Sequence, residues 1–149
     1  MDTQIVEILG RNKLIDELVR AGFEVATPVR DKGIDLIAYN DANPKFRAVP
    51  IQIKALSKGG FSIDKKYEKI PDLILTFIWN VDNEKEPATF YALTYSEALK
   101  IGEKSGWTKT PSWINGKKYT TTKPSPKLVK LLDEHKMTPE KWRKKLIEC

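Results

Sequence analysis

The sequence contains little cysteine, little histidine and no long hydrophobic run. One cysteine, Cys149, and one histidine, His135, cannot supply an internal disulfide or the ligands of a zinc cluster. We therefore expect a reducing, cytoplasmic location. No apolar run reaches the roughly 18 residues that a membrane span requires. Residues 1–4 also lack the basic patch and apolar run of a secretory signal, so no membrane partner is expected.

The charge of the chain is unevenly distributed along its 149 residues, which suffice for one domain with a sizeable core. Residues 1–100 carry 14 Lys+Arg and 15 Asp+Glu, whereas residues 101–149 carry 12 and 5. The net charge of +6 therefore arises in the last third. A polyanion such as DNA or RNA would explain this excess, and a lysine-rich surface that only favours solubility is the alternative.

The spacing of apolar residues predicts an α/β (α+β) domain that contains one sheet. Helices are expected at 4–20, 94–104, 126–135 and from Thr138 onward, with a weak preference for a short helix at 63–70. Strands are expected at 23–27, 34–39, 49–55, 73–79 and 89–93. Residues 105–126 are interpreted as an irregular, basic arm or hairpin. We take 1–104 as the core and 105–149 as a basic arm and C-terminal helices of the same domain.

Several turn and cap residues sharpen these boundaries. Gly22 is placed to end the first helix in the left-handed conformation. Thr94 and Glu97 have the spacing of a capping box. The continuous apolar run at 73–79 is typical of a central strand that is buried on both faces.

Three polar residues are predicted to converge on the sheet. Gln52 and Lys54 are two residues apart on one strand, so their side chains face the same way, while Ile51 and Ile53 face the other. Asp35 lies on the preceding strand, where a hairpin would place it beside Gln52. A lysine in this apolar strand, next to Ile53, is costly to bury unless it is paired, and Asp35 is a partner carboxylate close at hand.

Such a cluster suits phosphodiester hydrolysis. Carboxylate and amide oxygens can hold a hard divalent ion such as Mg²⁺, which polarises a phosphate and acidifies a bound water. Lys54 can orient that water or stabilise the charge of the transition state. The spacing alone leaves a second interpretation open, in which Asp35 and Lys54 are a structural pair at a sheet edge.

The segment Gly33-Ile34-Asp35, followed by Gln52-Ile53-Lys54, resembles the signature of the PD-(D/E)XK nucleases, in the variant where glutamine takes the second acidic place. The order of a helix followed by three strands also resembles this restriction-endonuclease-like fold over residues 4–100. Similarity to the bacterial homing endonucleases of this fold, encoded in group I introns within tRNA genes, extends into the basic C-terminal part. The resemblance implies a mixed central sheet flanked by helices, with a C-terminal helical extension.

The resemblance also implies roles for individual residues. Asp35 would bind the metal, Gln52 would replace the second carboxylate, and Lys54 would be the catalytic lysine. The main-chain carbonyl of Ile53 would be a further ligand. Family members often add a glutamate from the first helix, and that position is Arg11 here. We therefore expect weak metal binding and slow cleavage, as in a variant inactivated at this position; alternatively, Arg11 contacts a phosphate.

Basic residues near the motif and on the arm are candidates for contacts with double-stranded DNA. They are Lys13, Arg30, Lys32, Lys58, Lys65, Lys66, Lys69, Lys109, Lys117, Lys118 and Lys123. Trp107, Trp113 and Tyr119 are interpreted as packing anchors rather than base stackers.

Three functions remain open at this point. The first is a sequence-specific homing endonuclease that uses Mg²⁺ or another divalent cation. The second is a Holliday-junction resolvase or repair nuclease on the same fold, and the third is a non-catalytic nucleic-acid-binding module. Because cutting both strands requires two sites, a nuclease is expected to form a dimer or tetramer. The apolar residues of the C-terminal helices are candidates for its interface, or for packing on the core.

Overall fold

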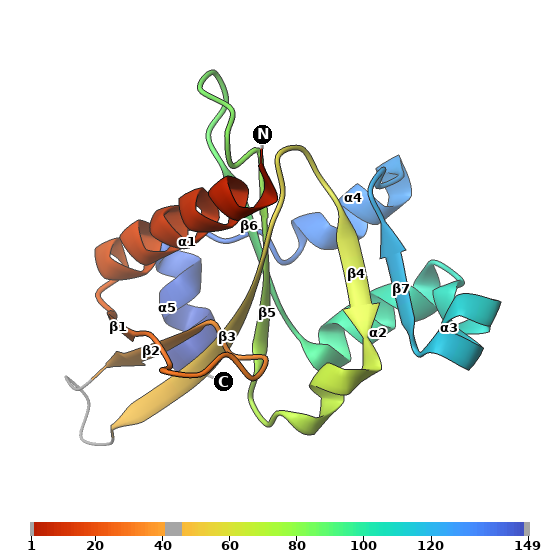
Figure 1. Cartoon of the computed structure of the whole chain (residues 1–149), viewed down its shortest axis with the longest axis horizontal. Coiled ribbons are helices and arrows are strands. Elements are labelled where there is room, and N and C mark those ends of the chain that lie inside the picture. Colours follow the sequence, from red (N-terminus) through yellow and green to blue (C-terminus); the bar gives the residue numbers. More distant parts are fainter. Residues whose placement is uncertain (1, 41–45, 148–149) are drawn as a thin grey trace.

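A five-stranded mixed sheet forms the middle layer of the computed structural model, which describes residues 2–40 and 46–147 (Figure 1). Its strand order is β1-β2-β3-β5-β6, and β3 pairs parallel with β5 while the other neighbours pair antiparallel. The strands are β1 (Glu24–Ala26), β2 (Leu36–Asn40), β3 (Arg47–Ala55), β5 (Ile74–Trp79) and β6 (Thr89–Thr94). The α+β class expected from the sequence is confirmed.

Helices α1 (Thr3–Arg20) and α5 (Pro139–Ile147) cover one face of this sheet (Figure 1). The opposite face carries α2 (Tyr95–Lys104), α4 (Pro126–Asp133) and a second, two-stranded sheet of β4 (Phe61–Asp64) and β7 (Lys118–Thr121). Shorter helical segments are η1 (Lys65–Lys69), η2 (Trp107–Lys109) and α3 (Pro111–Gly116). None of the helices in the described ranges is both long and apolar enough to cross a membrane.

The ends of the helices follow the signals in the sequence. Gly22 adopts φ +95° directly after α1, a conformation that residues with a side chain rarely take. The predicted capping box is present at α2, where Thr94 and Glu97 each accept a hydrogen bond from the other's main-chain N–H, at 3.1 and 2.8 Å. Ser125 and Thr138 cap α4 and α5 through their hydroxyl oxygens.

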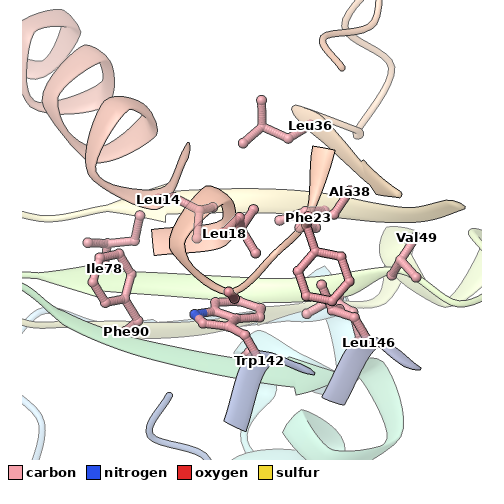
Figure 2. Close-up of a cluster of buried hydrophobic side chains, with 14 of the residues drawn as sticks. Leu14, Leu18, Phe23, Leu36, Ala38, Val49, Ile78, Phe90, Trp142 and Leu146 are labelled. Carbon is pink, nitrogen blue, oxygen red and sulfur yellow. The ribbon is translucent and has the colours of Figure 1, made fainter. Parts of the chain in front are cut away.

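Trp142 of α5 is the centre of the first hydrophobic core. Its side chain is fully buried, and Figure 2 shows it beside Leu14 and Leu18 of α1, Phe90 of β6 and Leu146. Leu128, Leu132 and Leu146 are likewise buried in the chain's own cores. These three leucines therefore cap the core rather than form a free interface, while Val129 and Leu131 are half-buried and Ile147 is exposed.

The second core lies under the β4–β7 sheet, where the structure refines one expectation and corrects another. The short helix predicted at 63–70 is present as the 3-10 helix η1 (Lys65–Lys69), whereas residues 63 and 64 are the end of β4. Phe61 and Ile63 alternate inward and are almost fully buried, and this period of two favours a strand. The arm is ordered as well: Tyr119 of β7 stacks on Trp107 with ring centroids 4.1 Å apart, which supports their interpretation as packing anchors.

Helix α1 approaches β3 closely at Gly10. A Cβ atom added at this glycine would lie 2.4 Å from the Cβ atom of Ala55, so a larger residue would push the helix away. This contact holds the N-terminal half of α1 against the end of β3, and it is the reason why Glu7 and Arg11 lie near Asp35 and Lys54.

Candidate functional site

The site lies where β3 extends beyond its neighbour β2. Strand β2 begins at Leu36, which pairs with Ile51, so the end of β3 from Ile53 onward has no partner from β2. The same register places Asp35, one residue before β2, opposite Gln52. The hairpin arrangement expected for Asp35 and Gln52 is thus present.

Asp35 occupies the place that a longer β2 would have filled. Its main-chain N–H donates to the Ile51 carbonyl at 2.8 Å, and its Oδ2 accepts a 2.7 Å hydrogen bond from the Ile53 N–H. Because the N–H and C=O of one strand residue point to the same side, the Ile53 carbonyl also points toward Asp35. A carboxylate oxygen and a main-chain carbonyl are therefore aimed at one space.

Several charges act on the half-buried Asp35 carboxyl. Burial raises the pKa of Asp35 above its ordinary value, and the Ile53 hydrogen bond opposes that rise. The negative charge of Asp31 raises the pKa further, whereas the cations Arg11 and Lys54 lower it. The net direction is upward, so the carboxyl holds its proton more tightly than an exposed aspartate does.

Gln52 lines the site cavity and has a buried, unsatisfied side-chain oxygen. Its side chain is 8% exposed, and its Oε1 accepts no hydrogen bond from the described part of the chain. A buried polar atom without a partner carries a desolvation penalty of ~1–3 kcal/mol. Such an atom is expected to bind a water, an ion or a ligand group that reaches it.

Lys54 extends from the same face of β3 toward η1. Its Nζ lies 5.9 Å from the ring centroid of Tyr67, and Nζ of Lys66 lies 5.1 Å from the same ring. An ammonium group is attracted to the face of an aromatic ring. Sequence reasoning missed Tyr67, although it is a buried tyrosine among lysines, because its proximity to Lys54 depends on the turn from β4 into η1.

A cavity of about 230 Å³ joins these groups. Its lining includes Asp35, Gln52 and Lys54, together with Arg11 and Glu7 from α1. Ile53, Ala55, Leu56 and Asp31 complete it. Sequence reasoning did not identify Asp31 as part of the site; it precedes Asp35 by four residues, in the turn before β2.

The donor atoms match a hard divalent ion in type but supply little negative charge. Asp35, the orphaned Oε1 of Gln52 and the Ile53 carbonyl are all oxygen donors. Within residues 2–40 and 46–147, no three Asp, Glu, His or Cys side chains gather closely enough to hold a metal. Arg11 also lines the cavity, and its positive charge would oppose the binding of a metal ion there. Glu7, one turn earlier on the same helix, is the nearest substitute carboxylate.

The expected DNA-contacting residues fall into separate groups. Lys65, Lys66, Lys69 and Lys117 line one surface hollow of about 600 Å³ together with Asp64 and Glu68. Lys118 is exposed on β7, Lys123 follows it, and Lys109 ends η2. Arg30 and Lys32 are exposed on either side of Asp31, and Lys58 is exposed between β3 and β4. Lys13 lines a different hollow, between α1 and β6, and is not part of the site cavity.

Comparisons with known proteins identify no relative. No family model, no curated protein and no solved structure matches the chain.

Proposed function

We propose that this chain is a metal-dependent endonuclease that hydrolyses phosphodiester bonds in double-stranded DNA. The observation that carries the proposal is the convergence of Asp35, Gln52 and Lys54 on one cavity at the unpaired end of β3. The unpartnered Oε1 of Gln52 supports a ligand in that cavity. The lysine-lined hollow around η1 supports a polyanionic substrate.

Each residue has a part in the proposed reaction. Asp35, Gln52 and the Ile53 carbonyl would hold a divalent ion such as Mg²⁺, which supplies polarisation of the scissile phosphate and acidification of a water. The Ile53 N–H fixes the Asp35 carboxylate in place. Lys54 would donate hydrogen bonds to a phosphate oxygen and stabilise the negative charge that develops in the transition state.

Arg11 limits this activity in the proposal. Arg11 lines the same cavity and its charge acts on Asp35, so it would compete with a metal ion for that carboxylate. We therefore expect weak metal binding and slow cleavage. The same observation favours a second candidate function, a DNA-binding module without catalysis in which Arg11 contacts a phosphate.

The substrate of the nuclease is also a proposal. A homing endonuclease would cut a linear duplex at a long specific site, as two or four assembled chains, whereas a junction resolvase would cut branched DNA of any sequence. Supercoiled plasmids that carry or lack a tRNA-gene insertion site, together with a synthetic four-way junction, distinguish these substrates.

The test is a nicking assay with Mg²⁺ on these DNAs, using the unsubstituted protein, Arg11→Glu and Arg11→Glu/Lys54→Ala. We expect Arg11→Glu to increase cleavage, and Lys54→Ala to remove it by a factor of ~10²–10⁴. If Arg11→Glu cleaves nothing while tight DNA binding persists, the chain is a binding module and the nuclease proposal is wrong.

A further inference from the structure

The β4–β7 ribbon has one face that the core does not use. The antiparallel register pairs Phe61 with Thr121 and Ile63 with Tyr119, and these residues point inward. The alternate pairs, Ser62 with Thr120 and Asp64 with Lys118, consequently point outward. Thr120 and Lys118 are exposed, and Ser62 and Asp64 are half-buried.

We infer that this outer face enters the major groove of DNA and that Lys118, Thr120 and Ser62 contact base edges there. This inference rests on the proposed DNA substrate and goes beyond it, because it names the element that would read sequence. A two-stranded ribbon has the width that the major groove admits. Lysine donates to guanine O6 and N7, while serine and threonine hydroxyls bond to either kind of base edge.

Lysines near the end of the ribbon formed by the Asp64–Lys118 pair are placed to hold the DNA backbone. The hollow next to this pair is lined by Lys65, Lys66, Lys69 and Lys117. The Lys65 N–H donates to the Lys117 carbonyl at 2.9 Å. Phosphate contacts of this kind fix the register of a protein on the duplex.

Asp64 acts within the chain rather than on a base. Its Oδ1 accepts the Lys66 N–H at 3.0 Å, and its Oδ2 lies 3.9 Å from the Lys66 ammonium. These contacts turn the chain from β4 into η1 and hold Lys66 beside the end of the ribbon.

The ribbon also ends beside the candidate active site. Tyr67 lies three residues after Asp64. The centroid of its ring is 5.1 Å from Nζ of Lys66 and 5.9 Å from Nζ of Lys54. A duplex that contacts Lys66 would therefore pass close to Lys54. This continuity distinguishes the ribbon from a lysine surface that serves only solubility.

The spacing of the readers predicts which bases they affect. Lys118 and Thr120 are two residues apart, or ~7 Å along the strand. One base-pair step is about 3.4 Å. We therefore expect the two side chains to influence positions about two base pairs apart.

The test is an affinity selection from duplexes with a randomised centre, performed with EDTA so that binding is measured without cleavage. The unsubstituted protein should enrich a sequence motif. Lys118→Gln and Thr120→Val should each lower the preference at one or two adjacent positions by about tenfold and leave the rest of the motif intact.

A second set of variants separates base reading from backbone contact. The triple variant Lys65→Gln/Lys66→Gln/Lys69→Gln should weaken binding to all duplexes alike and reduce the slope of log K against log salt by about 3. Lys144→Gln, an exposed lysine of α5 on the other face of the main sheet, is the matched control and should change neither quantity.

Three outcomes would overturn the inference. If Lys118→Gln and Thr120→Val leave the motif unchanged, or lower affinity uniformly, the ribbon does not read bases. If the unsubstituted protein enriches no motif but Arg11→Glu still nicks plasmid, base reading is wrong and the nuclease proposal survives. If the protein binds no duplex at all, both fail together.

Discussion

The main-chain N–H of Ile53 donates a 2.7 Å hydrogen bond to Oδ2 of Asp35, at the place where β2 has stopped pairing with β3. A side chain thus takes the position of a missing strand. The strand edge remains open for a ligand, while its exposed N–H group is satisfied. Structure and candidate chemistry therefore depend on the same carboxylate, and substitutions can separate the two.

Asp35→Asn should separate the structural role of this carboxylate from its proposed role in cleavage. The amide oxygen can still accept the Ile53 hydrogen bond, so the free energy of unfolding should change little, whereas the loss of the negative charge should abolish Mg²⁺-dependent nicking. Asp35→Ala should abolish nicking and also lower the free energy of unfolding by about 1–3 kcal/mol, because the Ile53 N–H loses its partner. Urea denaturation and the plasmid assay, both in the Arg11→Glu background, measure the two effects. Undiminished cleavage by Asp35→Asn would contradict the proposed metal site.

Gly10→Ala should destabilise the contact between α1 and β3. The new Cβ atom would lie 2.4 Å from that of Ala55, and the helix must move because both atoms are fixed to the backbone. We expect a loss of about 1–3 kcal/mol in the free energy of unfolding. Gly116→Ala is the control, since a Cβ atom added there meets nothing within 4 Å. Gly10→Ala combined with Ala55→Gly should recover stability, and failure to do so would show that the close approach is not the cause.

Trp142→Ala should lower the free energy of unfolding by about 3–5 kcal/mol, because it leaves a large cavity between α5 and α1. Trp142→Phe should lower the free energy of unfolding by less than the loss of side-chain volume suggests. The indole Nε1 is buried without a hydrogen-bond partner in the described part of the chain, and phenylalanine removes that unsatisfied group. Urea denaturation compares the two variants. An unchanged midpoint for Trp142→Ala would contradict a core role for α5.

Glu97→Gln should change the dependence of stability on pH. Although burial alone would raise it, the pKa of Glu97 is lowered overall, by the hydrogen bond from Lys145, the Thr94 N–H and the charges of Lys145 and His135. A lowered carboxyl pKa contributes stability above the ordinary value of 4.5, and this contribution is lost as the pH falls through the lowered pKa.

Glutamine can still accept the cap hydrogen bond but carries no charge. At pH 7 we therefore expect Glu97→Gln to lower the free energy of unfolding by roughly 1 kcal/mol, since the Glu97–Lys145 ion pair is partly solvated. The difference should shrink toward pH 3. A difference that stays constant over this range would show that the charge is not responsible.

Much of the main sheet could be predicted because its pattern is local. The apolar run at 73–79 is buried as a central strand, and Gly22, Thr94 and Ser125 mark helix ends through contacts within a few residues. The placement of Asp35 opposite Gln52 was also predictable. Side chains alternate between the two faces of a strand, so burial of the apolar face leaves few possible registers for the hairpin.

The elements that were missed depend on contacts distant in sequence. Residues 61–64 become a strand because β7, more than fifty residues later, pairs with them. Tyr67 reaches Lys54 only after that pairing has set the turn into η1. The apolar pattern of α4 predicted a buried face, but pattern alone could not say whether the chain's own core or a second chain would cover it.

The last third of the chain contributes to both cores: α5 inserts Trp142 on one face of the sheet, and α4 and β7 cover the other. While the ribosome has released only the first hundred residues, Phe61, Ile63, Leu14 and Phe90 have incomplete surroundings. Folding of both cores must then wait until residues 118–147 have also emerged, and pairing of β4 with β7 is a non-local step. A nascent or truncated chain would expose two apolar surfaces at once and depend on chaperones to avoid aggregation.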